Sequence, residues 1–379
     1  MKLKTIVNSI IRDLAAWKMT RYYSRFYGKV MSINGIPDSW TEGEDEWVQR
    51  WSVVGKADPL YFRCFSRYVG KDMNIVPENL CRNVIEKCLN PSRYLPYYTD
   101  KNIFDRLFPA GTCAVTVLRK MNGFFYDVLY NPVRIECDND LQNHLDSSRV
   151  KSVCIKPSVG SGSGVGVRFY CRKEDGWRSC DNDTLLTVAE LDRMYGKDFI
   201  LQESLTQSQG MSYFNPTSVN TLRLTLYRSV TTDQWTVPSA IIRIGGKGSL
   251  VDNAHAGGAY VGINENDGSL CKTVLDQYGR SCEQFNDIDF TKDHTIPHWN
   301  EILEFALMIG NSIPHLRLLA LDIMIDASGK PRLIEFNSSD YSMWLFQFTT
   351  HGAFGDYTEE IIRYCSDAGN NNPLYVELK

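Results

Sequence analysis

Two carboxylates near the C-terminal end of the sequence are the side chains best placed to do chemistry. Asp322 lies in the strand-like run 318–326 and Glu335 lies in the run 332–337, with the turn signal Ser328-Gly329 between them. Two short apolar runs joined by such a turn predict a β-hairpin. The hairpin would bring both carboxylates to one place, where they could hold a cation.

The register of this hairpin decides which side chains share a face. We place Asp326 opposite Pro331. Asp322 then faces Glu335 at a Cβ distance of ~5 Å, and Asn337 shares the face of Glu335 because side chains alternate along a strand. Two carboxylates and an amide oxygen suit Mg²⁺, and the alternative is a solvent-exposed face with unrelated acids. The opposite, apolar face is predicted to consist of Leu321, Ile323, Ile325, Ile334 and Phe336.

A second motif is the glycine- and serine-rich segment 158–166, which follows a strand that ends at Lys156. Glycines let backbone N–H groups approach an anion, and the lysine supplies positive charge for phosphate. The sequence has no GxxxxGK[ST] motif, no GxGxxG that opens a helix, and neither the HRD nor the DFG signature of protein kinases. The segment is therefore either a phosphate-binding loop of another class or a plain surface hairpin.

The elements that must position these motifs change in character along the chain. Residues 1–98 are mostly helical in pattern and rich in aromatic residues, whereas antiparallel hairpins mixed with helices follow and predict an α+β fold. Met121-Asn122-Gly123 is a strong hairpin signal. Helices are expected near 187–195, 297–311 and 355–366, and strands over 113–119, 124–130, 152–156, 165–171, 198–203, 219–229, 238–244, 259–263, 318–326 and 332–337.

Composition excludes some classes of protein. The 379 residues carry a formal net charge of −4, which gives no reason to expect nucleic acid as a partner. Eleven scattered cysteines without a CxxC pair indicate reduced thiols, and no apolar stretch approaches a membrane span or a signal peptide, so we expect a cytoplasmic protein. Residues 2–29 form a basic amphipathic pattern, which we interpret as a helix packed on its own domain, with contact to a membrane surface as the less favoured alternative.

The order of these motifs resembles the ATP-grasp superfamily, and most of all its sugar-transfer-associated branch. A lysine and a glycine-rich hairpin loop come first, and an acidic strand with Glu335-x-Asn337 follows, over about residues 90–365. The resemblance implies an ATP-grasp fold, in which two α/β lobes with antiparallel sheets clasp ATP. The expected division is a helical, aromatic-rich N-terminal region (1–98), a lobe with the glycine-rich phosphate loop (99–203) and a lobe with the Mg-binding carboxylates (204–379).

The resemblance also implies roles for individual residues. Lys101 and Lys156 would contact the α- and β-phosphates, and Gln202 and Glu203 would lie at the hinge beside adenine. The loop that covers the phosphates would contain Ser158, Gly160, Ser161, Gly162, Ser163 and Gly164. The residues that bind Mg²⁺ between the protein and the phosphates would be Asp322, Glu335 and Asn337.

The implied activity is ATP- and Mg²⁺-dependent ligation of a carboxylate to an amine through an acyl phosphate, in surface polysaccharide biosynthesis. Arg223 and Arg243 would stabilise the transferred phosphate, and His255 could act as a base; surface ion pairs and a structural histidine are the alternatives. The expected partners are a small-molecule carboxylate and an amine, with a sugar acid or an amino acid as candidates. A phosphotransferase with a hydroxyl acceptor and a catalytically dead nucleotide-binding module are the alternative functions.

Overall fold

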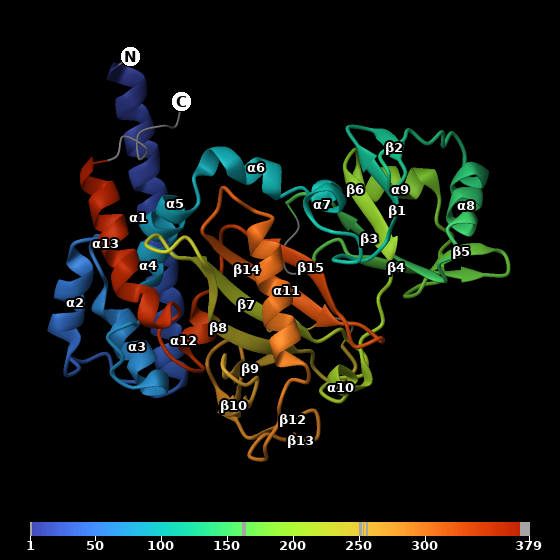
Figure 1. Ribbon diagram of the computed structural model, residues 1–379. Helices are drawn as coiled ribbons and strands as arrows, with labels where there is room; N and C mark the ends of the chain where they lie inside the picture. Colours follow the sequence, from blue (N-terminus) through green and yellow to red (C-terminus); the bar gives the residue numbers. More distant parts are fainter. Residues whose placement is uncertain (1, 161–163, 250–251, 253, 255–256, 372–379) are drawn as a thin grey trace.

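The computed structural model describes residues 2–160, 164–249, 252, 254 and 257–371. Two antiparallel sheets lie beside each other, and a helical layer covers the second sheet on the side away from the first (Figure 1). This mixture of helices and antiparallel strands confirms the predicted α+β class. No helix within the described part of the chain combines the length and the apolar character needed to cross a bilayer.

The first sheet has six strands in the order β2-β1-β6-β3-β4-β5. Its first hairpin turns at Asn122 and Gly123, whose φ angles of 51° and 91° are those of a tight two-residue turn, as the sequence predicts. Helices α8 (Asp138–Ser147) and α9 (Val188–Tyr195) pack on it through a core that includes Leu141, Leu191 and Trp177. The strands are β1 (Thr116–Met121), β2 (Phe124–Tyr126), β3 (Ser152–Pro157), β4 (Arg168–Lys173), β5 (Gly176–Ser179) and β6 (Phe199–Glu203).

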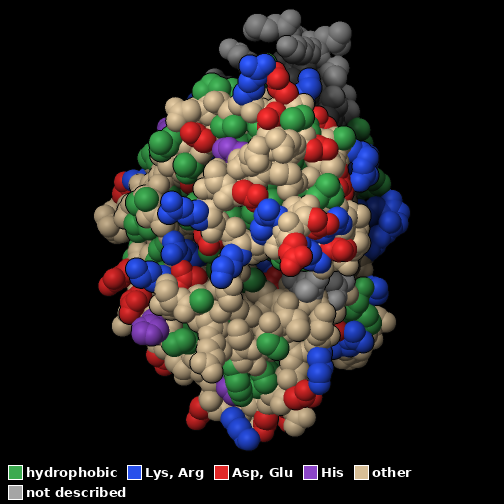
Figure 2. Space-filling view, turned by 90° about the vertical axis from the view of Figure 1, so that its right-hand side faces the viewer, with side chains coloured by type: hydrophobic (Ala, Val, Ile, Leu, Met, Phe, Trp, Pro, Cys, Tyr) green, Lys and Arg blue, Asp and Glu red, His purple; other side chains and the backbone are tan. Residues whose placement is uncertain are grey.

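Charged side chains of both signs are interspersed over the face of the molecule that the first sheet presents (Figure 2). In the first sheet, two residues of β4 form ion pairs with acidic residues: Arg172 with Asp146 and Lys173 with Asp183. A nucleic-acid-binding face would carry a basic stripe instead. The described residues of this face show a mixture of charges and no basic stripe.

The second sheet has seven strands in the order β11-β10-β9-β8-β7-β14-β15. Helix α11 (Trp299–Asn311) covers one face, where Leu222, Leu224 and Leu226 are buried. The alternate residues of the same strand point to the other face, where Tyr227 packs under the helical layer. The strands are β7 (Thr221–Arg228), β8 (Trp235–Ile244), β9 (Ala259–Ile263), β10 (Leu270–Leu275), β11 (Ser281–Cys282), β14 (Leu318–Ile325) and β15 (Pro331–Asn337), and β12 (Gln284–Phe285) pairs separately with β13 (Ile288–Asp289).

The helical layer is built around α1 (Lys2–Ile33), whose side chains Tyr23, Tyr27, Val30 and Met31 are buried. These residues recur at helical spacing, so the C-terminal part of α1 packs on its own domain, as expected. Leu14 and Trp17, which belong to the predicted apolar face, are exposed instead. The layer also contains α2 (Glu44–Ser52), α3 (Pro59–Val69), α4 (Glu78–Leu80), the π-helix η1 (Cys81–Ile85), α5 (Glu86–Leu89), α12 (Trp344–Gln347) and α13 (Thr358–Asn371). The shorter helices η2 (Ser92–Tyr94), α6 (Leu95–Tyr98), η3 (Lys101–Ile103), α7 (Phe104–Leu107), α10 (Gln209–Ser212) and η5 (Gly355–Tyr357) lie in connections.

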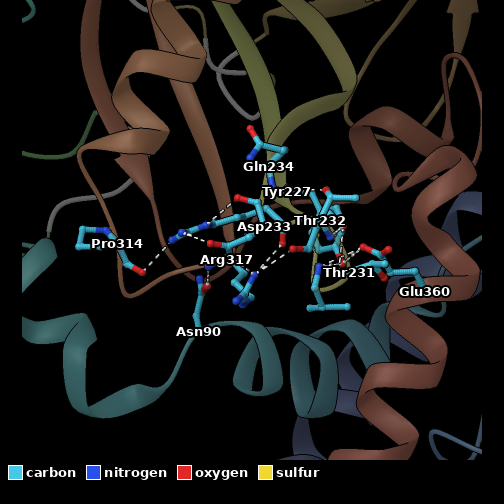
Figure 3. Close-up of polar contacts among 12 residues, drawn as sticks. Asn90, Tyr227, Thr231, Thr232, Asp233, Gln234, Pro314, Arg317 and Glu360 are labelled. Carbon is cyan, nitrogen blue, oxygen red and sulfur yellow. Dashed lines mark hydrogen bonds and ion pairs between the residues drawn. The ribbon is translucent and has the colours of Figure 1, made fainter.

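A polar network attaches the helical layer to the second sheet (Figure 3). Asn90 donates to the carbonyl of Leu318 at 2.7 Å and accepts from the backbone N–H of Arg317 and Leu318. On the other side of the network, the Tyr227 hydroxyl donates to Glu360 of α13 at 2.6 Å. Because the network satisfies buried polar groups on both layers, it holds the helices in a defined position against the sheet.

The β14–β15 hairpin departs from the predicted register at its turn. Ile325, and not Asp326, is opposite Pro331, but a β-bulge restores the predicted pairing of Asp322 with Glu335. Because of the bulge, Leu333 is buried on the apolar face, and the prediction that Ile334 lies there is wrong. Ile334 instead lines the cavity described below.

The hairpin turn is held by Asp326, which accepts hydrogen bonds from the backbone N–H groups of Ser328 and Lys330 and from Nε of Arg332. Burial pushes the pKa of Asp326 upward, but these hydrogen bonds and that of the Ser328 hydroxyl outweigh it and lower the pKa to about 2. Asp326 therefore does not pair with Pro331, contrary to the predicted register, and its carboxylate holds the turn through these hydrogen bonds instead.

Candidate active site

A cavity of about 260 Å³ lies between the two sheets. It contains most of the charged residues that the sequence singles out, although they are far apart in the chain. Residues from the first sheet and the segments beside it are Lys101, Ala114, Cys154, Lys156, Gly164, Val167, Phe169, Gln202, Glu203 and Leu205. Residues from the second sheet and the helical layer include Thr221, Arg223, Arg243, Asp252, Tyr260, Asp322, Met324, Ile334, Glu335, Ser342 and Trp344.

The floor of the cavity is a row of side chains across three neighbouring strands. Arg223 on β7 pairs with Asp322 on β14, which pairs in turn with Glu335 on β15. Directly opposed residues project from the same face of a sheet. The antiparallel register therefore places one cation and two carboxylates side by side on the face that lines the cavity.

Asp322 is almost fully buried, and the guanidinium of Arg223 neutralises it. Nε and Nη2 of Arg223 donate to the two carboxylate oxygens at 2.8 and 2.7 Å, the bidentate geometry that arginine favours. Nη1 of Arg243 lies 3.5 Å from the same carboxylate. Burial alone would raise the pKa of Asp322, but the positive charge and hydrogen bonds of Arg223 outweigh it and hold the pKa below its usual range.

Asp252 is a site residue that the sequence did not indicate. Its carboxylate lies 3.2 Å from Nη2 of Arg243 and accepts a hydrogen bond from the backbone N–H of Thr221 at 3.1 Å. Burial is the main cause that raises its pKa above the usual range, against the opposing charge of Arg243. The only sequence signal was its place in a glycine-rich stretch. Thr221 and Cys154 could have been found, since they lie two residues from Arg223 and Lys156 on the same strands.

Lys101 and Lys156 reach the cavity from the opposite wall. Nζ of Lys101 lies 3.4 Å from Oε2 of Glu335, and Nζ of Lys156 donates to the carbonyl of Ile334 at 3.4 Å. The two lysines thus cross the gap between the sheets. Burial lowers the pKa of Lys101, although Glu335 opposes the shift and Lys156 adds to it. A polyanion in the cavity would stabilise both ammonium groups.

The other end of the cavity is mostly apolar. Cys154, Phe169, Leu205, Met324 and Ile334 line it, and such a surface suits a flat heterocycle. The chain crosses between the lobes beside it. Ser208 donates its backbone N–H to the carbonyl of Ile325, so the segment after β6 pairs with the end of β14.

The two predicted hinge residues lie at this crossing. The Gln202 side chain is buried and donates to the carbonyl of Ala114 at 3.1 Å, so it stabilises the segment that leads into β1. Glu203 is the last residue of β6, and its backbone N–H donates to Val115.

Asp322, Glu335 and Asn337 fit the donor set of a Mg²⁺ site. Two carboxylates face the cavity, and Nδ2 of Asn337 is buried without a hydrogen-bond partner in the described structure. The two ends of an amide are exchangeable at this position, so Asn337 can present an oxygen there. Among the described residues, no group of three or more His, Cys, Asp or Glu side chains is arranged to hold a metal ion. The phosphates of a nucleotide would have to supply further oxygens.

The glycine-rich loop is described only at its two ends. Gly160 and Gly164 have φ angles of 67° and 73°, a conformation that favours glycine. The Ser158 hydroxyl is buried and has no hydrogen-bond partner in the described part of the chain. Four predicted site residues lie outside the described residues: Ser161, Gly162, Ser163 and His255.

Comparisons with known proteins identify relatives. A family model described as sugar-transfer associated ATP-grasp matches residues 81–361, which is well over half of the chain. A comparison with curated proteins finds no match.

Several solved structures are similar at low sequence identity. The ATP-grasp ligase PsnB, complexed with a phosphomimetic variant of its minimal precursor, Mg and ADP, is 15% identical, with 73% of this chain and 61% of that chain covered and a TM-score of 0.39. The biotin carboxylase–β-γ-ATP complex from Campylobacter jejuni is 10% identical, with 73% and 48% covered and a TM-score of 0.42. The D-cycloserine synthetase DcsG is 12% identical, with 85% and 93% covered and a TM-score of 0.41. This chain thus spans less than two thirds of PsnB and about half of the biotin carboxylase.

Proposed function

We propose that this chain, which belongs to the sugar-transfer-associated ATP-grasp family, is a Mg²⁺- and ATP-dependent ligase that joins a carboxylate to an amine in surface polysaccharide biosynthesis. The observation that carries the proposal is the cross-strand row of Arg223, Asp322 and Glu335, with Lys101 and Lys156 reaching toward it from the other lobe. These two acids and three cations, which line one cavity, are suited to hold Mg²⁺ and a polyphosphate.

The residues of the chain would act mainly by positioning and charge. ATP supplies the γ-phosphoryl group, which passes to a carboxylate oxygen, and an amine then displaces phosphate to form the amide. Lys101 and Lys156 neutralise the phosphates that leave with ADP. Asp322, Glu335 and Asn337 are the residues that would hold Mg²⁺.

Arg223 and Arg243 are proposed to bind the oxygens of the transferred phosphate. In the described structure both guanidinium groups are engaged with Asp322, and Arg243 also with Asp252. Binding of Mg²⁺ by Asp322 would weaken these ion pairs and leave the arginines available to an anion. The cluster can thus exchange internal partners for a substrate.

The family description supports a role near sugar transfer, and the order of the sequence motifs resembles that of ATP-grasp ligases. The test is ATP turnover with panels of carboxylates and amines, read as ADP and free phosphate released together with an amide product. Glu335→Gln is expected to lower turnover by about a hundredfold or more, because it removes a metal ligand. Glu283→Gln, at an exposed position in a distant turn, is the matched control.

The products separate the proposed ligase from its alternatives. Phosphate that stays on the substrate would identify a phosphotransferase. Wild-type protein that binds MgATP but does not release ADP with any pair of substrates would indicate a nucleotide-binding module. Glu335→Gln with normal turnover would show that the metal assignment is wrong.

A further inference from the structure

A second and larger cavity, of about 1010 Å³, adjoins the first. The two share Lys101, Arg223, Glu335, Ser342 and Trp344, so they meet at the proposed phosphate- and metal-binding end. From there the second cavity extends to helix α1. A ligand in it would present its reactive group to Arg223 and Glu335.

Aromatic rings and hydroxyl groups line this second cavity. Tyr22, Tyr23 and Phe26 come from α1, and Phe336 and Trp344 come from the β15–α12 region. Thr99, Asn337, Ser338, Ser339 and Ser342 add polar groups. Flat apolar faces next to many hydrogen-bonding groups suit a ring that is apolar on its faces and hydroxylated at its edge, as a sugar is.

The segment between β15 and α12 has the strained backbone that often marks a ligand site. Asp340 and Ser342, neither of them a glycine, have φ angles of 63° and 56°. Hydrogen bonds from the helical layer hold the segment. Asn90 donates to the carbonyl of Ser338 at 2.8 Å, and Glu86 accepts from the backbone N–H of Asp340 at 3.2 Å. The wall is therefore preorganised.

The charges around the cavity favour an anion. Its two acids already have cationic partners, Glu335 with Lys101 and Asp340 with Arg82. Lys18 lines the cavity, is exposed, and forms no ion pair among the described residues. Arg21 and Arg25 follow on the same exposed side of α1, within ~10 Å along the helix axis. They likewise lack an ion pair in the described structure, and Arg21 stacks on Trp17.

We propose that the second cavity binds the carboxylate substrate, and that this substrate is a sugar acid carried in an oligosaccharide. The inference rests on the proposed function for the fate of the carboxylate, but the binding itself does not depend on it. The reacting carboxylate lies at Arg223, the sugar rings lie against Tyr22 and Trp344, and further anionic units follow Lys18, Arg21 and Arg25 along α1.

The experiment measures binding of trigalacturonate to the full chain by calorimetry, with uncharged maltotriose as the comparison. Trigalacturonate is expected to bind and maltotriose to bind at least about tenfold more weakly. Tyr22→Ala and Lys18→Glu are each expected to weaken trigalacturonate binding by about tenfold. Tyr22 is 62% exposed, so its loss leaves the fold intact. Tyr213→Ala and Lys292→Glu, on other exposed parts of the surface, are matched controls that should bind as the wild type does.

Three results would overturn the inference. The first is wild-type protein that binds neither trisaccharide. The second is normal binding of trigalacturonate by both Tyr22→Ala and Lys18→Glu. The third is binding to phosphatidylglycerol vesicles that depends on Lys18 while trigalacturonate does not bind, which would identify α1 as a surface for lipid.

Failure of the proposed function is a separate result. Binding of trigalacturonate that depends on Tyr22, without ADP release in the ligase assay, would keep the sugar-acid site and reject the ligase. If the protein does not bind trigalacturonate but releases ADP with small carboxylates, the ligase assignment stands and the sugar-acid site is rejected.

Discussion

Two buried clusters of carboxylates in this molecule each contain arginine, but the carboxylate pKa values shift in opposite directions. In the cleft, Arg223 holds Asp322 with two hydrogen bonds of 2.8 and 2.7 Å, and the pKa of Asp322 is lowered. In the helical layer, Nε of Arg82 lies 3.3 Å from Glu78 and 3.9 Å from Glu86. Burial raises the pKa of Glu78, and it raises that of Glu86 to about 8 despite Arg82.

The two clusters differ in the number of arginines for each carboxylate and in the geometry of the hydrogen bonds that these arginines make. In the helical layer a single guanidinium serves Glu78, Glu86 and Asp340, and one oxygen of each buried glutamate lacks a hydrogen-bond partner in the described structure. Desolvation then outweighs attraction and the cluster retains a proton near neutral pH. In the cleft, two arginines keep a fully ionised acid in place. The carboxylate of Asp322 thus stays ionised near neutral pH, whereas Glu86 of the helical cluster keeps its proton.

The largest expected effect comes from breaking the cleft cluster with Asp322→Ala. Removing one partner of a buried pair leaves Arg223 uncompensated, which costs about 3 kcal/mol of unfolding free energy. The variant is also expected to lose the thermal stabilisation that MgATP gives the wild type, because ligand-induced stabilisation follows affinity. Asp293→Ala, at a side chain that is 98% exposed, serves as the control. A variant that MgATP still stabilises fully would remove Asp322 from the nucleotide site.

Arg82→Met is the equivalent change in the helical layer. At pH 8 it leaves two buried glutamates without their cation, and we expect a loss of about 3 kcal/mol in unfolding free energy. At pH 5 Glu86 is protonated, because burial raises its pKa to about 8, so the loss should be smaller. Denaturant unfolding at the two pH values measures this. Exposed Arg67→Met is the control, and an equal loss at both pH values would contradict the protonated state.

The sequence predicts the cleft cluster better than the helical one, for physical reasons. Strand alternation places Arg223 on the polar face, and the hairpin signal pairs Asp322 with Glu335, so local rules suffice for these residues. The bulge that moves Ile334 into the cavity has no local signal.

Contacts between distant segments could not be predicted either. Arg82 meets Asp340 across 258 residues of sequence, and α1 meets the β15–α12 segment at the second cavity. Such contacts depend on how whole layers pack. The same holds for Asp252, which becomes a site residue only because Arg243 and Thr221 meet it in the folded structure.

Glu86→Gln is expected to change the unfolding free energy less than the two previous variants, and to raise it where they lower it. The folded pKa of about 8 lies above the usual value of 4.5, so between these pH values the folded state binds more protons than the unfolded state. Stability of the wild type therefore falls as pH rises through this window. The variant lacks this loss, and it should be more stable than the wild type at pH 8 and similar at pH 4. Thermal unfolding against pH tests it, with Glu283→Gln as the control; parallel profiles for all three proteins would show that Glu86 is ionised.

The smallest expected effect is that of Ser158→Ala. Ser158 directly follows β3, and its carbonyl accepts from the backbone N–H of Lys101. The Ser158 hydroxyl is buried and has no hydrogen-bond partner in the described structure, like one oxygen each of Glu78 and Glu86 in the helical cluster. Removing an unsatisfied hydroxyl should leave the nucleotide-free protein as stable as the wild type or up to about 1 kcal/mol more stable.

If this hydroxyl finds its partner on a phosphate, as the proposed role requires, Ser158→Ala should also reduce the thermal shift caused by MgATP. Ser204→Ala is the matched control, because its hydroxyl is also buried and unpartnered among the described residues. A MgATP shift that Ser158→Ala leaves intact would make this hydroxyl a structural residue. The nucleotide would then depend on the lysines and the cross-strand row, with backbone N–H groups as the loop's contribution.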